Sequence, residues 1–288
     1  MTARPSDFIS ADRDWTTATQ LIVAVLGGGK IGEAVARGVA KSDRVSKVIM
    51  TRRNIAPVKH LKSSRMEVTT DNQRATREAD IIIVAVKAGD ARVLLQGIRK
   101  NASGKLVISI MAAVSIKRLQ AALPRAKIVR SMPNIAATIG EAITAYSPGP
   151  GLSAKDLEDT RFVLQSFGEC VEVPESLMNA VTALSGSGPA YIATLIEALV
   201  SGGLMVGMPR DVAMALATKT LTGTADMLKA KNIHPAELRD AVTTPAGTTI
   251  AGIYELEKGS FRTSVMNAVE AATRAAERVA KKFEAESE

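Results

Sequence analysis

A short apolar run followed at once by a glycine motif is the feature that most constrains the fold of this chain. Residues 21–26 are all apolar, which is typical of a parallel strand buried on both faces. The run ends in Gly27-Gly28-Gly29-Lys30-Ile31-Gly32, a G-x-G-x-x-G motif, and helical spacing of apolar residues follows from Ile31 to Ala40. A strand, this motif and a helix in direct succession predict the phosphate-binding turn of a dinucleotide-binding fold.

Each position of the motif has an expected task. Gly27 makes the tight turn, Gly29 lets the backbone approach a pyrophosphate, and Gly32 allows close packing of helix on strand. Lys30 and Ile31 occupy the first helical turn, whose N-terminus faces the anion. A glycine-rich turn without a ligand is the alternative. A Walker-type phosphate loop is excluded because no Gly-Lys-Ser/Thr sequence follows.

The next predicted strand, residues 47–50, ends where an Asp or Glu would read the free 2′-hydroxyl of NAD. The chain instead has Thr51-Arg52-Arg53-Asn54. Two guanidinium groups suit a 2′-phosphate, because arginine presents a planar fork of donors and keeps its charge. We therefore expect Arg52 and Arg53 to bind NADPH, with NADH possible but weaker. The alternative is that one or both arginine side chains point into solvent.

Apolar runs recur through the first half of the chain, most of them separated by segments long enough for a crossover helix. They lie at residues 47–50, 81–86, 106–110 and 128–129, with shorter β-like pieces at 143–146 and 171–173. This alternation predicts an α/β fold with a doubly wound parallel sheet of the Rossmann type. At about 150 residues per domain, the chain is expected to divide into a loose extension (1–20), a dinucleotide-binding domain (21–174) and a second domain (175–288).

Residues 175–288 predict an all-helical domain, because they are rich in Ala, Met, Leu and Thr and contain no strand-like run. The expected helices cover residues 176–185, 189–206, 210–229, 235–242, 248–258 and 263–284. Several are apolar nearly all round, so we expect a homodimer through this domain, with a higher homo-oligomer possible. The apolar stretch 176–209 is interrupted by polar residues and glycines, so buried helices are expected and no membrane partner.

Charge and aromatic content narrow the range of partners. The net charge of +8 suits a phosphorylated small molecule as well as a nucleic acid. Aromatic residues make up only 3% of the chain and the cations are spread along it, so no nucleic-acid partner is expected.

Cys170 is the single cysteine, which excludes an intrachain disulfide and a thiolate metal cluster. A reducing compartment fits a single cysteine, and residues 1–20 lack a signal-peptide pattern, so a cytoplasmic protein is expected. No residue pattern suggests a metal site, so no metal is expected.

Two tracts of the helical domain, residues 184–191 and 242–250, are dense in hydroxyl groups and glycine. The second leads into a predicted helix, where backbone N–H groups beside threonine hydroxyls favour a carboxylate. An ordinary helix cap and turn is the alternative for each tract. The two histidines provide no base in a motif: His60 is expected on the surface, and His234 precedes Pro235 as a helix-entry residue.

From Leu21 to about Val279 the chain resembles the pyrroline-5-carboxylate reductase family. The most specific matches are Ala-Val-Thr-Ala-Leu-Ser-Gly-Ser-Gly-Pro-Ala-Tyr at 180–191 and Gly-Thr-Thr-Ile-Ala-Gly at 247–252. Shorter matches lie at 132–134, 259–262 and 267–271. The resemblance implies a dinucleotide domain, an interlocking helical dimer domain and an active site between the two. It also implies NADPH-dependent reduction of 1-pyrroline-5-carboxylate to L-proline, the last step of proline biosynthesis.

The resemblance further implies residue roles. Thr249 would be the catalytic residue that hydrogen-bonds the ring nitrogen of the imino acid substrate, and Thr244, with the backbone N–H groups of Gly247 and Thr248, would hold its carboxylate. The segment Ala85-Val86-Lys87 would lie along the cofactor near its nicotinamide half. Two rival functions stay open: reduction of another small cyclic imino acid, and a non-catalytic NADPH-binding regulator.

One departure from the family pattern bears on the substrate pocket. Residues 244–247 read Thr-Pro-Ala-Gly where Ser-Pro-Gly-Gly is usual, so Ala246 stands in place of a glycine. If this position requires a positive φ, alanine strains the loop. A loop reshaped in this way would change the preferred imino acid.

Overall fold

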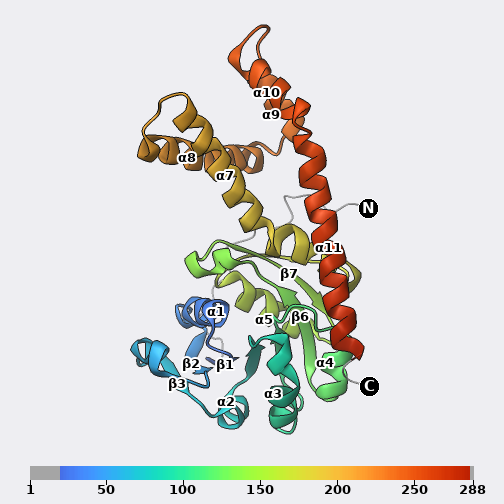
Figure 1. Cartoon of the computed structure of the whole chain (residues 1–288). Coiled ribbons are helices and arrows are strands. Elements are labelled where there is room, and N and C mark those ends of the chain that lie inside the picture. Colours follow the sequence, from blue (N-terminus) through green and yellow to red (C-terminus); the bar gives the residue numbers. More distant parts are fainter. Residues whose placement is uncertain (1–19, 286–288) are drawn as a thin grey trace. The chain divides into compact units, whose positions relative to one another are not determined.

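The computed structural model describes residues 20–285 (Figure 1). These residues form two compact units, one of residues 20–189 and 269–285 and one of residues 190–268, which we call the sheet unit and the helical unit. The division differs from the predicted boundary after residue 174, because residues 175–189 and the end of the last helix belong with the sheet unit. The predicted loose extension, residues 1–20, lies outside the described residues except for Gln20.

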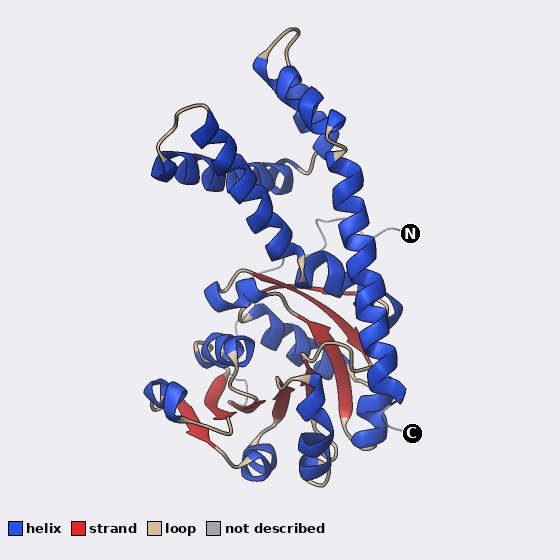
Figure 2. Ribbon diagram, viewed as in Figure 1, coloured by secondary structure: helices blue, strands red, loops and turns tan. Residues whose placement is uncertain are grey.

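Eight strands of the sheet unit form one sheet in the order β3-β2-β1-β4-β5-β6-β7-β8, drawn in red in Figure 2. All neighbouring strands are parallel except β6 and β7. The order reverses at β1, which lies between β2 and β4, so the predicted Rossmann-type fold is confirmed. The strands are Leu21–Leu26 (β1), Val45–Thr51 (β2), Met66–Thr69 (β3), Ile81–Val84 (β4), Leu106–Ser109 (β5), Lys127–Met132 (β6), Ala142–Pro148 (β7) and Gly168–Glu172 (β8).

Helices cover both faces of this sheet, and β1 shows why its run of apolar residues is unbroken. Val23 and Val25 pack in the core shared with α1 and α5, whereas Ala24 and Leu26 pack in the core shared with α3 and α4. All four side chains are fully buried, as expected for a central parallel strand. The helices are Lys30–Ala40 (α1), Asn72–Glu78 (α2), Ala91–Ile98 (α3), Ile116–Ala122 (α4) and Ala154–Gln165 (α5).

Two features of the sheet depart from the predicted strands. The edge strand β3 was not predicted, because Met66–Thr69 is only four residues long and alternates with polar residues. Strand β7 runs antiparallel to β6, whereas a wholly parallel sheet was expected. The connection between these two strands holds only the short 3₁₀ turn η4, Ile135–Ile139, which is too short for the crossover that parallel strands need.

The segment that leads into the helical unit is not the single helix predicted for residues 176–185. It consists of the 3₁₀ turn η5 (Glu175–Leu177), one α-helical turn, α6 (Met178–Val181), and a π-helical turn, η6 (Thr182–Gly186). The carbonyl of Thr182 accepts a hydrogen bond from the backbone N–H of Ser187 at 2.9 Å, which widens the turn. The later helices follow the prediction closely: α7 (Gly188–Met205), α8 (Arg210–Lys231), α9 (Pro235–Ala241), α10 (Thr248–Lys258) and α11 (Phe261–Ala285).

The helical unit has a small core of its own. Its one cluster of buried apolar side chains consists of Val200, Ala213 and Ala217, among the residues that the structure describes. Large apolar side chains of α7, α8, α10 and α11 are exposed in the single chain, among them Leu199, Met205, Leu216, Tyr254 and Met266. An apolar surface of this extent is typical of a face that another protein surface covers.

One described stretch, Glu175–Met205, is long and apolar enough to cross a membrane by length and composition alone. A single stretch of this kind is weak evidence for a membrane span, because core helices pass the same test. The most apolar part of this stretch is only 6% buried in the single chain, so the chain alone does not provide the burial predicted for these helices.

Candidate cofactor and substrate sites

The glycine loop between β1 and α1 lies close against the end of β4. Gly27 has a φ of +119°, and a Cβ atom on it would lie 2.7 Å from the carbonyl carbon and oxygen of Ala85. A Cβ atom on Gly32 would collide with the carbonyl oxygen of Gly27. Both positions therefore require glycine, because neighbouring backbone lies too close for a Cβ atom. Gly27 requires it also for its positive φ.

Gly29 is different, because nothing lies within 4 Å of where its Cβ atom would be. It is the N-cap residue of α1, and no side chain caps this helix end. The backbone N–H groups of Lys30 and Ile31 are among those at a helix N-terminus that lack a partner within the helix. An exposed N-terminus of this kind, with glycine beside it, fits the diphosphate of a dinucleotide.

The structure gives the two arginines after β2 different surroundings. The Arg52 guanidinium donates a hydrogen bond from Nη1 to the carbonyl oxygen of Gly28 at 2.9 Å, so this side chain lies on the glycine loop. The Arg53 side chain is 90% exposed and forms an ion pair with Asp90, with 3.2 Å between Nη2 and Oδ2. The sequence does not predict Asp90 as the partner of Arg53, because the two residues are 37 positions apart and no motif connects them.

Ala85, Val86 and Lys87 lie between the end of β4 and the 3₁₀ turn η3, Ala88–Asp90. The first two are half-buried and Lys87 is exposed. Because β4 is parallel to β1 and next to it, this segment lies at the same edge of the sheet as the glycine loop. The predicted cofactor residues of the sheet unit thus lie together at the carboxyl ends of β1, β2 and β4, and their binding roles stay predictions.

The substrate tract of the helical unit forms a tight turn before α10. The backbone N–H of Gly247 donates to the carbonyl oxygen of Thr244 at 3.1 Å, and Pro245 and Ala246 are the two central residues. Gly247 is the N-cap of α10, and a Cβ atom on it would collide with the hydroxyl oxygen of Thr244. The Thr244 hydroxyl therefore lies at the start of a helix of 11 residues, where partial positive charge gathers. Thr249, in the first turn, is half-buried.

Ala246 has a φ of +54°, so the positive backbone angle considered for this position is present. Proline followed by a residue of positive φ is the pattern of a type II turn, which favours glycine at the second central position. We expect Ala246→Gly to raise the free energy of unfolding by roughly 1 kcal/mol, because glycine adopts this angle without steric cost. Urea unfolding of the two proteins measures the difference.

Ala251→Gly, at an exposed position inside α10, is the matched control for that substitution. It should lower the free energy of unfolding by about 1 kcal/mol, since glycine weakens a helix interior. A loss of stability in both variants would show that the backbone angle at residue 246 carries no strain.

The remaining candidate side chains have structural explanations. His234 is the N-cap of α9, and its Nδ1 accepts a hydrogen bond from the backbone N–H of Ala236 at 3.2 Å, so the helix-entry prediction is confirmed. His60 is exposed, as predicted, and contacts Arg37. Burial raises the pKa of the Cys170 thiol to about 11, which keeps it protonated at neutral pH and makes it a poor nucleophile. Among the described residues no group of three or more His, Cys, Asp or Glu side chains converges on one point.

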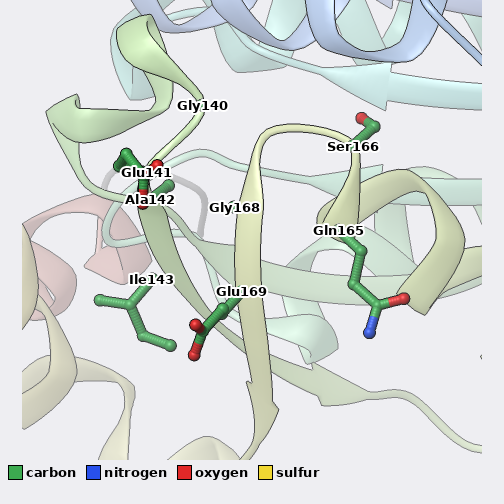
Figure 3. Close-up of a pocket in the computed structure, with 8 residues that line it drawn as sticks. All are labelled: Gly140, Glu141, Ala142, Ile143, Gln165, Ser166, Gly168 and Glu169. Carbon is green, nitrogen blue, oxygen red and sulfur yellow. The ribbon is translucent and has the colours of Figure 1, made fainter. Parts of the chain in front are cut away.

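A separate cavity of about 420 Å³ lies at the starts of β7 and β8 (Figure 3). Residues 140–143, 165–166 and 168–169 line it, and none of them is a predicted site residue. Its side-chain charges are the carboxylates of Glu141 and Glu169, which do not suit an anionic cofactor or an imino acid carboxylate. We do not assign a role in the reaction to it.

Comparison with known proteins agrees with this geometry. A family model described as NADP oxidoreductase, coenzyme F420-dependent, matches residues 22–113, and one described as pyrroline-5-carboxylate reductase dimerisation matches residues 175–279. The sheet, the glycine loop and these matches define an oxidoreductase of the Rossmann type with a dimerisation domain.

Individual relatives narrow this class. A pyrroline-5-carboxylate reductase of Synechocystis sp. is 40% identical over 263 residues, which cover 90% of this chain and 98% of the relative. One from Methanosarcina acetivorans is 41% identical over the same shares of the two chains. A Plasmodium falciparum pyrroline carboxylate reductase solved with NADP bound has a TM-score of 0.83 and 31% identity, covering 92% of this chain and all of the other. The chain belongs to the pyrroline-5-carboxylate reductase family.

Proposed function

We propose that this protein reduces 1-pyrroline-5-carboxylate to L-proline with NADPH, the last step of proline biosynthesis. The observation that carries the proposal is the turn of residues 244–247 at the N-terminus of α10, which offers hydroxyl and backbone N–H donors. The sheet unit of the same chain contains the glycine loop expected for a dinucleotide. A small acid with a ring nitrogen needs such donors. The named relatives match over nearly their whole length, which supports the same conclusion.

The residues of the sheet unit would hold the cofactor. The N-terminus of α1 would bind the diphosphate, while Arg52 and Arg53 would meet the 2′-phosphate that distinguishes NADPH from NADH. Bound NADPH supplies a hydride for the C=N bond. The segment 85–87 would lie along the nicotinamide half.

The residues of the helical unit would hold the substrate. Thr244 and the backbone N–H groups of Gly247 and Thr248 would bind the carboxylate, which needs no cationic side chain because the helix N-terminus already favours an anion. The Thr249 hydroxyl would donate a hydrogen bond to the ring nitrogen, where electron density gathers as the imine is reduced. A cyclic imine is basic enough to take its proton from water, so the enzyme mainly aligns donor and acceptor carbons.

The test of this function is conversion of 1-pyrroline-5-carboxylate by the purified protein, with product identified by mass spectrometry and chirality. We expect one L-proline for each NADPH oxidised. Reduction of a different cyclic imino acid in preference would favour the first rival function. Tight NADPH binding without turnover of any cyclic imine would favour the regulator.

We infer that the protein is a homodimer formed through the helical unit, with a higher homo-oligomer possible. The dimerisation model covers this unit, and the exposed apolar residues of α7, α8, α10 and α11 supply the surface. Burial of this surface in a second copy would also account for the apolar stretch 175–205 without a membrane.

The double variant Leu199→Glu, Leu216→Glu should convert the dimer into monomer at micromolar concentration. Each leucine buried at the interface contributes about 1.5–3 kcal/mol to association, and burial of an unpaired carboxylate costs more than that. Both side chains are about half exposed in the single chain, at 48% and 53%. Light scattering coupled to gel filtration gives the mass. The matched control is Val93→Glu, Ile139→Glu, which changes two exposed apolar residues of the sheet unit and should leave the mass unaltered.

A reducing compartment, the cytoplasm, fits a chain whose only cysteine is a free, partly buried thiol. We propose no nucleic-acid partner, since the positive charge serves the phosphates of the cofactor.

A further inference from the structure

The ion pair between Arg53 and Asp90 lies at the carboxyl ends of β2 and β4, where the cofactor is predicted to bind. Strands β2, β1 and β4 are parallel neighbours, so their carboxyl ends lie at one edge of the sheet with β1 in the middle. Arg53 follows β2 and Asp90 follows β4. The ion pair therefore joins the loop after β2 to the loop after β4, across the carboxyl end of β1, where the glycine loop begins.

The adenosine ribose of a dinucleotide binds beside the carboxyl end of β2 in this fold. Arg53 can therefore pair with either of two anions, the Asp90 carboxylate or the 2′-phosphate of NADPH. The Arg53 side chain is 90% exposed, and its guanidinium lies 3.2 Å from the Asp90 carboxylate. Arg52 is not in the same competition, because its guanidinium is bonded to the carbonyl oxygen of Gly28.

We propose that Asp90 sets the strength of NADPH binding and its preference over NADH by competing with the 2′-phosphate for Arg53. The carboxylate holds Arg53 in the free enzyme and must release it when a 2′-phosphate binds. A cofactor without the 2′-phosphate leaves the ion pair intact, so Asp90 weakens the binding of NADPH and not that of NADH.

This inference deepens the proposed function and rests on its assignment of the cofactor, but not on the identity of the imino acid. The test uses two ligands without a nicotinamide, adenosine 2′,5′-bisphosphate and ADP, with calorimetry on the full chain. Asp90→Asn should lower the dissociation constant of the bisphosphate three- to tenfold and change that of ADP less than twofold. Asparagine keeps the size of the side chain and its ability to lie at the start of α3.

The matched control is Asp43→Asn. Asp43 forms an ion pair of similar length, 3.1 Å, with Arg65, but it precedes β2 and so lies at the opposite edge of the sheet. The charge change is the same, and neither dissociation constant should move. If Asp43→Asn strengthens bisphosphate binding as much as Asp90→Asn, net charge alone is responsible and the proposal is wrong.

A double-mutant cycle tests the competition itself. In an Arg53→Ala background the gain from Asp90→Asn should fall below twofold, because the contested cation is gone. A full gain in that background, an unchanged bisphosphate constant, or weaker ADP binding in Asp90→Asn would overturn the proposal. Its failure is distinct from failure of the proposed function, which would show as absent proline formation while the bisphosphate still binds.

Discussion

Thr249→Val should lower kcat/KM for 1-pyrroline-5-carboxylate about 10²- to 10³-fold, the loss typical of removing one donor to developing charge. Valine keeps the branched shape of threonine and removes only the hydroxyl. Because Thr249 is half-buried in the first turn of α10, the substitution leaves the turn of residues 244–247 and its hydrogen bond in place. The loss should fall mainly on kcat, since the carboxylate donors are retained.

Thr224→Val is the control for this variant. Its hydroxyl is exposed on α8 and donates only to the carbonyl oxygen of Thr220, one turn back in the same helix, at 2.7 Å. We expect activity within twofold of the parent protein. If Thr249→Val is equally harmless, the ring nitrogen is protonated and oriented by another group, and the assigned role is wrong.

The second large effect concerns the cofactor. Changing Arg52 and Arg53 together to alanine should raise the KM for NADPH by at least about 100-fold, because hydrogen bonds between charged groups contribute roughly 1.5–3 kcal/mol each to binding. The KM for NADH should rise far less. Steady-state kinetics with both cofactors, at saturating 1-pyrroline-5-carboxylate, separate the two values.

The single variants refine this prediction through the different surroundings of the two side chains. Arg53→Ala should affect NADPH alone, whereas Arg52→Ala should weaken both cofactors, because Arg52 also bonds to the carbonyl oxygen of Gly28 in the glycine loop. Arg65→Ala, at the opposite edge of the sheet, is the control and should change neither KM. Equal effects of the double variant on NADPH and NADH would contradict the assignment of the 2′-phosphate.

Local sequence signals were sufficient for much of the fold. The run of residues 21–26 with its glycines predicted both β1 and the start of α1, because burial on both faces and a tight turn leave a recognisable composition. Helix α10 was predicted with both its limits, since Gly247 precedes it and Gly259 follows it. The positive φ at Ala246 was considered because alanine stands where the resembled family usually has glycine, and the structure confirms it.

Other features depend on contacts between segments far apart in the sequence. The antiparallel direction of β7 follows from a short connection, which a list of apolar runs does not reveal. Arg52 and Arg53 are adjacent and chemically equal, yet one bonds to Gly28 and the other to Asp90. The sequence predicts one helix over residues 176–185 and not the π-helical turn at residues 182–186, because the hydrogen bond from Ser187 to Thr182 leaves no mark in the spacing of apolar residues.

The central claim is tested most directly by the oxidation of NADPH, followed by its nicotinamide absorbance, with 1-pyrroline-5-carboxylate and with the six-membered ring analogue as substrates. We predict rapid turnover of the five-membered ring, slower turnover of the six-membered ring, and a higher kcat/KM with NADPH than with NADH. No turnover of the five-membered ring by protein that binds NADPH tightly would contradict the account.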